Sequence, residues 1–124
     1  MPVLSEGNNL GDVLKYEATQ FYSRDVLTVP DGQTLVLGAV VGIQTADGKA
    51  RVLDPAAADG TEVAAGVIVQ DSAPSGADED VPFIVRHAIV ADHALVWPGG
   101  ISAPETTTAI AQLKAAGIIV RKGA

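Results

Sequence analysis

Near the middle of this 124-residue chain, a run of small residues leads into a run of β-branched ones. Residues 62 to 70 read Glu-Val-Ala-Ala-Gly-Val-Ile-Val-Gln, so that Ala64 to Gly66 precede the apolar Val67 to Val69. Small side chains let a neighbouring backbone come close, and a short apolar run is typical of a strand covered on both faces. The pattern predicts a buried central strand, around which the other elements must be arranged.

Turn signals divide the first half of the chain into short segments. Asp-Gly pairs occur at residues 31–32, 47–48 and 59–60, and both residue types tolerate the positive φ angles of tight turns. Two β-rich segments, residues 24–29 and 33–43, lie on either side of the first of these turns. The Asp-Gly pair at 47–48 predicts a two-residue hairpin loop after the second segment. Such spacing is typical of an all-β domain.

One helix is indicated near the C-terminal end of the sequence. Ser102 and Glu105 have the spacing of a capping box, in which each side chain accepts a hydrogen bond from the other residue's backbone. The helix is predicted to reach about residue 116, with Ile110 and Leu113 facing the core. Gly117 follows as the C-terminal stop.

The composition limits the kind of core that this domain can build. Hydrophobic residues make up 48% of the chain but aromatic residues only 4%, so the core must consist mainly of Val, Ile, Leu and Ala. With no cysteine, the fold must be held by packing or by oligomerisation. Residues 81–90 and 118–120 are predicted as two further strands. We therefore predict a mainly β, partly open barrel-like domain over residues 21–124 with a short C-terminal helix.

Residues 1–20 differ from the rest of the chain and are predicted to form a flexible N-terminal arm. They begin with a polar stretch containing glycine and two asparagines, which disfavours regular structure. A strand-competent segment follows, consisting of Asp12, Val13, Leu14, Lys15, Tyr16 and Glu17. Either this arm is a frayed terminus, or it becomes ordered by adding a strand to a partner's sheet. The sequence leaves both readings open.

Charge and motif content argue against several classes of function. The formal net charge is −7, and the eight basic residues are scattered, whereas a nucleic-acid surface needs clustered Lys and Arg. No apolar run has the length of a membrane span, and the first residues lack the pattern of a signal peptide. The chain has no nucleophile elbow, phosphate loop or dinucleotide motif. We expect a soluble protein that is made in a cytoplasm, with no enzymatic activity, cofactor or small-molecule substrate.

Two groups of residues can each be interpreted in two ways, one functional and one structural. His87, Asp92 and His93 could form a metal site if a turn brought the histidines together, although ordinary surface histidines are the simpler interpretation. The single tryptophan, Trp97, either packs in the core or anchors a subunit contact.

The order of several short motifs resembles the head decoration protein family of tailed bacteriophages and prophages. These motifs are Ala58-Asp59-Gly60, Ala65-Gly66-Val67-Ile68, Leu95-Val96-Trp97-Pro98, the C-terminal helix and Ile118-Ile119-Val120. Residues 11–17 and 22–25 are similar to the opening of bacterial and prophage members. The resemblance covers nearly the whole chain, although the arm differs from that of the lambda protein, which implies a different capsid surface.

The resemblance implies a β-clip fold that assembles as a homotrimer. Such trimers bind at three-fold positions on the outside of the expanded capsid and stabilise it against the pressure of packaged DNA. The arm is then expected to add a strand to the major capsid protein, and the protein is expected on the virion after synthesis in the cytoplasm of a host bacterium. Candidates for the trimer contact are Trp97, Pro98, Gly99 and Gly100.

Two alternatives remain at this point. One is a non-catalytic β-rich recognition module on a virion or cell surface, and the other is a small metal-dependent hydrolase that uses the two histidines and Asp92.

Overall fold

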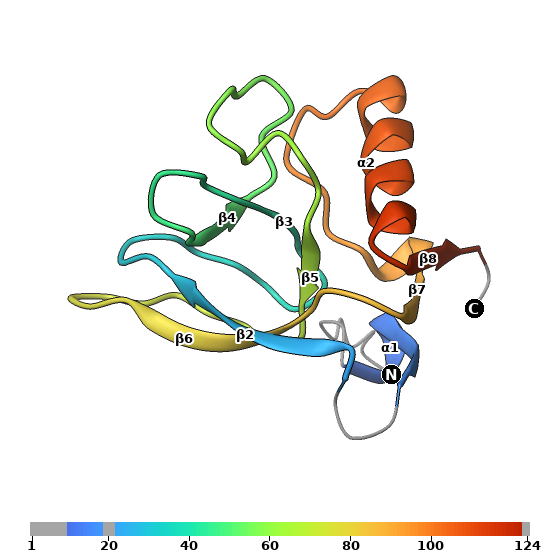
Figure 1. Ribbon diagram of the computed structural model, residues 1–124, viewed down its shortest axis with the longest axis horizontal. Coiled ribbons are helices and arrows are strands. Elements are labelled where there is room, and N and C mark those ends of the chain that lie inside the picture. The colour runs from blue at the N-terminus through green and yellow to red at the C-terminus, as the bar shows by residue number, and fades with distance from the viewer. Residues whose placement is uncertain (1–9, 19–21, 123–124) are drawn as a thin grey trace, which may run out of the picture.

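A computed structural model describes residues 10–18 and 22–122, which form two open β-sheets and one long helix (Figure 1). The elements in chain order are α1 (Leu10–Val13), β1 (Leu14–Glu17), β2 (Arg24–Val29), β3 (Val40–Ile43), β4 (Ala50–Val52), β5 (Gly66–Ile68), β6 (Glu79–Ile84), β7 (Ala88–Ala91), the 3₁₀ turn η2 (Asp92–Ala94), α2 (Ala103–Ala115) and β8 (Ile118–Arg121). The predicted mainly β fold with a C-terminal helix is confirmed.

The central strand of the larger sheet is β5, and the strand order is β2-β6-β5-β3-β4 with all neighbours antiparallel. Val67 packs in one apolar cluster and Ile68 in the other, and both side chains are fully buried. A Cβ added at Gly66 would lie 2.6 Å from the carbonyl oxygen of Ile84 on β6. The prediction of a strand covered on both faces, with a close backbone neighbour, is therefore confirmed.

This strand is shorter than residues 62–70, and the predicted length is wrong. The preceding residues form turns, in which the backbone N–H of Val63 donates to the carbonyl of Gly60. The N–H of Ala64 donates to the side-chain oxygen of Gln112 on α2, at 2.8 Å. The N–H of Ala65 donates to the carbonyl of Val41 on β3 at 2.8 Å, and the register with β3 runs from Gly66.

The three Asp-Gly pairs are turns, as predicted. Gly32, Gly48 and Gly60 have φ angles of +86°, +70° and +106°, a region that glycine occupies without steric cost. The hairpin of β3 and β4 is also confirmed, but the N–H of Gln44 donates to the carbonyl of Lys49. The loop between the paired residues therefore has four residues rather than two.

The prediction of one strand over residues 81–90 is wrong, because the chain changes sheets at residues 85–87. β6 pairs with β2 and β5, whereas β7 lies at the centre of a second sheet of order β1-β7-β8. His87 has a φ of +50°, a left-handed conformation that ends one strand before the next begins. β7 and β8 are parallel and are connected through α2, which packs against β8.

Helix α2 begins and ends as predicted, with the capping box of Ser102 and Glu105 present and a φ of +86° at Gly117. Leu113 is completely buried and Ala109 nearly so, whereas Ile110 is only half-buried. The helix therefore covers the main apolar cluster with a narrow stripe of side chains.

Residues 10–17 pack within the fold, and an extended conformation over residues 12–17 is wrong for Asp12 and Val13, which end α1. The side chain of Val13 is 1% exposed and belongs to the main apolar cluster, which explains why the chain turns inward here. The remaining parts of the predicted arm, residues 1–9 and 19–20, lie outside the described residues.

Candidate interaction surfaces

β1 lies at one edge of the three-stranded sheet, where it pairs antiparallel with β7. The register shifts between Leu14 and Tyr16, as in a β-bulge. Leu14 consequently packs against the main apolar cluster, while the side chain of Tyr16 is 56% exposed. Of these two side chains, only that of Tyr16 is presented to solvent.

A set of polar contacts holds β1 against both sheets. The guanidinium of Arg24 on β2 donates two hydrogen bonds to the carboxylate of Glu17, at 2.7 and 2.6 Å. The Ser23 hydroxyl accepts from the N–H of Ala18 at 2.9 Å and donates to the carbonyl of His87 at 2.8 Å. Ser23 is fully buried, so these bonds have no competition from water. We call this group, Glu17, Ala18, Ser23, Arg24 and His87, the clasp.

An apolar row crosses the outer face of the small sheet. Tyr16 pairs with Ile89, and Ile89 pairs with Ile119, so these side chains lie side by side on three strands. Ile119 is 39% exposed, and a shallow groove of about 240 Å³ runs beside the row, also lined by Gly117 and His87. The sequence predicts strands over residues 81–90 and 118–120, but nothing in it indicates that Ile89 and Ile119 share an outer face.

The predicted trimer-contact residues form a second surface, at the loop between η2 and α2. Trp97 is half-buried against the main apolar cluster, whereas Gly99 and Gly100 are exposed. Val96 forms an isolated β-bridge with Ala39. This pairing brings the exposed Val36 close to the loop that contains Trp97. Two grooves flank the loop, of about 230 Å³ and 510 Å³. We call the residues Val36, Val96, Trp97, Pro98, Gly99 and Gly100 the tryptophan surface.

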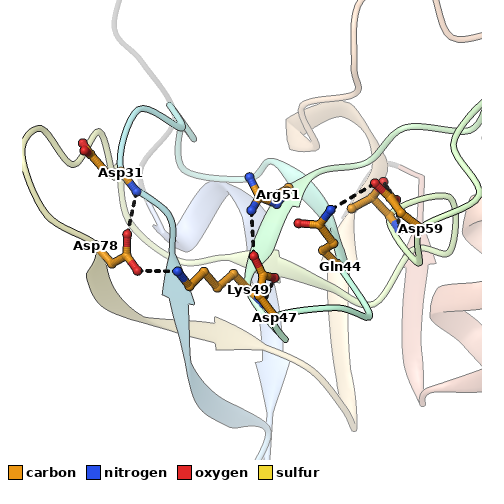
Figure 2. A network of polar contacts seen from close by, with 8 residues as sticks. Asp31, Gln44, Asp47, Lys49, Arg51, Asp59 and Asp78 are labelled. Atoms are coloured by element: carbon orange, nitrogen blue, oxygen red, sulfur yellow. Dashed lines mark hydrogen bonds and ion pairs between the residues drawn. The ribbon is translucent and has the colours of Figure 1, made fainter.

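A network of charged side chains ties together the loops at the far end of the larger sheet (Figure 2). Lys49 Nζ contacts the carboxylate of Asp78 at 2.6 Å, and Asp78 also accepts from the N–H of Asp31 at 2.9 Å. Arg51 pairs with Asp47 at 2.8 Å. These contacts connect the β3–β4 hairpin with the loop before β6, so their role is structural.

The same contacts displace the pKa values of these groups. The hydrogen bond from Lys49 lowers the pKa of Asp78 and raises that of Lys49 itself. The backbone N–H of Lys49 is the main cause that lowers the pKa of Asp47, and the Thr61 hydroxyl does the same for Asp59. Each acid is therefore held in its charged form.

The proposed metal ligands do not form a cluster. Among the described residues, no group of three or more His, Cys, Asp or Glu side chains is placed to hold a metal ion. The ring of His87 instead contacts that of Tyr22 edge-on, with the ring centres 5.2 Å apart. No helix in the described ranges is long and apolar enough to cross a membrane.

Charge is distributed unevenly along the molecule. Residues 106–122 hold three of the eight basic residues, Lys114, Arg121 and Lys122, and none of the acidic ones. The acidic run Asp78 to Asp80 lies at the start of β6, at the opposite end of the long axis from β8 (Figure 1). The described residues thus offer an open strand edge, apolar surfaces and a charge gradient, which are features of a protein that acts by assembly and contact.

The fold and these surfaces define a small, mainly β domain. Over residues 3–118 the sequence matches the model of the bacteriophage lambda head decoration protein D family, and the chain therefore belongs to that family. Its members are structural proteins located on the surface of the phage capsid. The family resemblance drawn from the sequence is confirmed. A comparison with curated protein sequences gave no match.

Proposed function

We propose that this protein assembles as a trimer, binds at three-fold positions on the outside of the expanded capsid and stabilises the shell against the pressure of packaged DNA. Membership of the decoration family supports the kind of partner. The observation that carries the mechanism is the position of β1 at an open sheet edge, with Tyr16 exposed beside it.

The major capsid protein is proposed to pair with β1 through main-chain hydrogen bonds. One side of β1 bonds to β7, and no other strand of the described residues pairs with its outer side. Such an edge presents unpaired N–H and C=O groups, which an extended segment can satisfy by strand addition. The available backbone is that of Leu14–Glu17, and the role of Asp12 and Val13 is to anchor it through α1.

The tryptophan surface is proposed as the contact between subunits. Its exposed members, Val36 at 44% and Val96 at 36%, lie next to the half-buried Trp97. Apolar side chains around an aromatic anchor are typical of the centre of an interface. We also propose that the chain has a β-clip fold. In support of it, β2 and β4, the two edge strands of the larger sheet, contact each other.

Trimer formation and capsid binding support each other energetically. A single short strand pairing binds weakly, because immobilising each backbone residue costs about 1–2 kcal/mol. Three linked copies make the second and third contacts intramolecular, which raises avidity by roughly 10² to 10⁴.

Light scattering and co-sedimentation with expanded, undecorated capsids test the two surfaces separately. We expect Tyr16→Glu to keep the trimer mass but to lose capsid binding, and Val96→Asp to lower the mass to that of one chain and weaken binding roughly 10²-fold. Val26→Glu is the matched control, because Val26 is 66% exposed on β2 and belongs to neither surface. A wild-type protein that stays monomeric and does not sediment with capsids would refute the proposal.

A further inference from the structure

The opposite edge of the small sheet, formed by β8, also carries free backbone groups. The N–H of Ala88 donates to the carbonyl of Gly117 at 3.1 Å, and Ala88 lies opposite Ile118 in the parallel register. In a parallel pair, the residues on either side of the register partner make the hydrogen bonds. Residues 117, 119 and 121 therefore bond to β7, while the N–H and C=O groups of Ile118 and Val120 point away from it.

No described residue satisfies that outer edge. β8 is the last strand in the order β1-β7-β8, and none of the hydrogen bonds of the described backbone outside the strand ladders involves Ile118 or Val120. Helix α2 packs against β8, Ile118 belongs to the main apolar cluster, and the partly buried Val120 packs against it. The side chains thus fix the strand in place and leave its edge open.

The surroundings of this edge indicate what kind of segment would fit it. Ile119 continues the apolar row of Tyr16 and Ile89, so one face beside the edge is apolar. Arg121, two residues further on the same face, is exposed, as is the adjacent Lys122. Although the net charge of the chain is −7, residues 106–124 contain no acidic residue. A segment that complements this edge would therefore place apolar side chains next to Ile119 and carboxylates next to Arg121.

We propose that the outer edge of β8 is a second strand-accepting site, which takes an extended acidic segment of the capsid shell. This inference rests on the proposed function and adds to it a contact separate from β1. The incoming backbone would bond to Ile118 and Val120, with its carboxylates against Arg121 and Lys122. Because β1 and β8 are the two edges of one sheet, the sheet would be held by the shell at both sides.

A second copy of this chain is a poorer source of the acidic segment. The acidic run Asp78 to Asp80 lies at the other end of the long axis from β8 (Figure 1). In a cyclic trimer every subunit contact joins two different surfaces, which a three-fold rotation must bring together. The subunit contact already proposed is the tryptophan surface, which leaves β8 for a segment of the shell.

Co-sedimentation with undecorated capsids, using the full chain, tests the backbone and the charge separately. Val120→Pro removes the outward N–H and keeps the inward bonds of residues 119 and 121, a placement that edge strands tolerate. Val120→Ala is its control, because it loses the same side-chain packing but retains the N–H. We expect capsid affinity about tenfold lower for Val120→Pro than for Val120→Ala, because a buried partner carbonyl is left unpaired.

Arg121→Glu tests the charge, with Lys114→Glu on α2 as the control of equal charge change. We expect Arg121→Glu alone to weaken binding, by about tenfold at low salt and by less as the salt concentration rises. Light scattering should give the wild-type mass for every variant.

Equal affinities within either pair of variants would overturn the inference, provided that the wild type binds. A change of mass in Arg121→Glu would overturn it too, since the edge would then join copies of this chain. Failure of the wild type to bind capsids at all would instead remove the proposed function on which the inference rests.

Discussion

Gly66 is a position at which the structure predicts that a single added methyl group lowers stability. The Cβ of Gly66→Ala would lie 2.6 Å from the carbonyl oxygen of Ile84 and 3.4 Å from Cγ1 of Val85. Real Cβ atoms essentially never approach closer than 3.0 Å, so β5 and β6 must separate locally by at least about 0.4 Å. These strands are ladder neighbours in the centre of the sheet, and neither can move without disturbing both apolar clusters.

The magnitude follows from two opposed effects. Overpacking of this kind costs about 1–3 kcal/mol, while replacing glycine by alanine restricts the unfolded chain and returns about 0.4–1 kcal/mol. We therefore expect Gly66→Ala to lower the free energy of unfolding by about 1–2 kcal/mol. For a domain of this size that corresponds to a decrease in Tm of roughly 4–8 °C.

Gly99→Ala is the matched control. Gly99 has no heavy atom within 4 Å of the added Cβ and no positive φ. Because Gly99 lies in the tryptophan surface, the Tm of this variant is compared where light scattering gives the wild-type mass, and it should then be unchanged or slightly higher. The assay is thermal unfolding followed by circular dichroism, with all variants at the same concentration because assembly makes Tm concentration-dependent. Equal Tm values for Gly66→Ala and the wild type would refute the close approach of β5 to β6.

Two further predictions concern the clasp and the charged loops. Ser23→Ala leaves the N–H of Ala18 and the carbonyl of His87 without their hydrogen-bond partner. We therefore expect amide hydrogen exchange to accelerate in β1 more than in β5. Equal acceleration in both strands would contradict the idea that Ser23 stabilises β1 in particular. Asp47, Asp59 and Asp78 have folded pKa values below the ordinary 3.8, so their contribution to stability is complete above that pH and is lost as the pH falls through the folded values. Urea unfolding should therefore show a decline below about pH 4 that is shallower in Asp78→Asn, and an unchanged slope in that variant would contradict the ion pair with Lys49.

Local signals in the sequence gave most of the elements. The segment 24–29 forms β2 as predicted, and the capping box fixes the start of α2. Each signal consists of a few adjacent residues whose backbone preferences act without help from the rest of the chain. The same holds for the Asp-Gly turns.

Signals that depend on distant partners were less informative. Residues 81–90 have a continuous β-rich pattern, and only the packing of two sheets decides that the chain bends at His87. The exposure of Ile119 has the same origin, because an isoleucine on the outer face of a three-stranded sheet has the same sequence pattern as one in a core. The apolar row on that face could therefore not be predicted.

The tryptophan surface depends on both the sequence order and the tertiary structure. The sequence places Trp97 to Gly100 side by side and predicts a sharp stop there, but Val36 joins them only through the bridge of Ala39 to Val96.

By itself, the sequence determined the mainly β class, the turns, the helix and the family, because these follow from short-range backbone chemistry and from the order of motifs. Tertiary structure alone decided that Val13 is buried, that β1 pairs with β7 and that β1 and β8 form the two open edges of one sheet. The physical reason is that strand pairing and burial depend on residues far apart in the chain, whose contacts exist only once both sheets have formed.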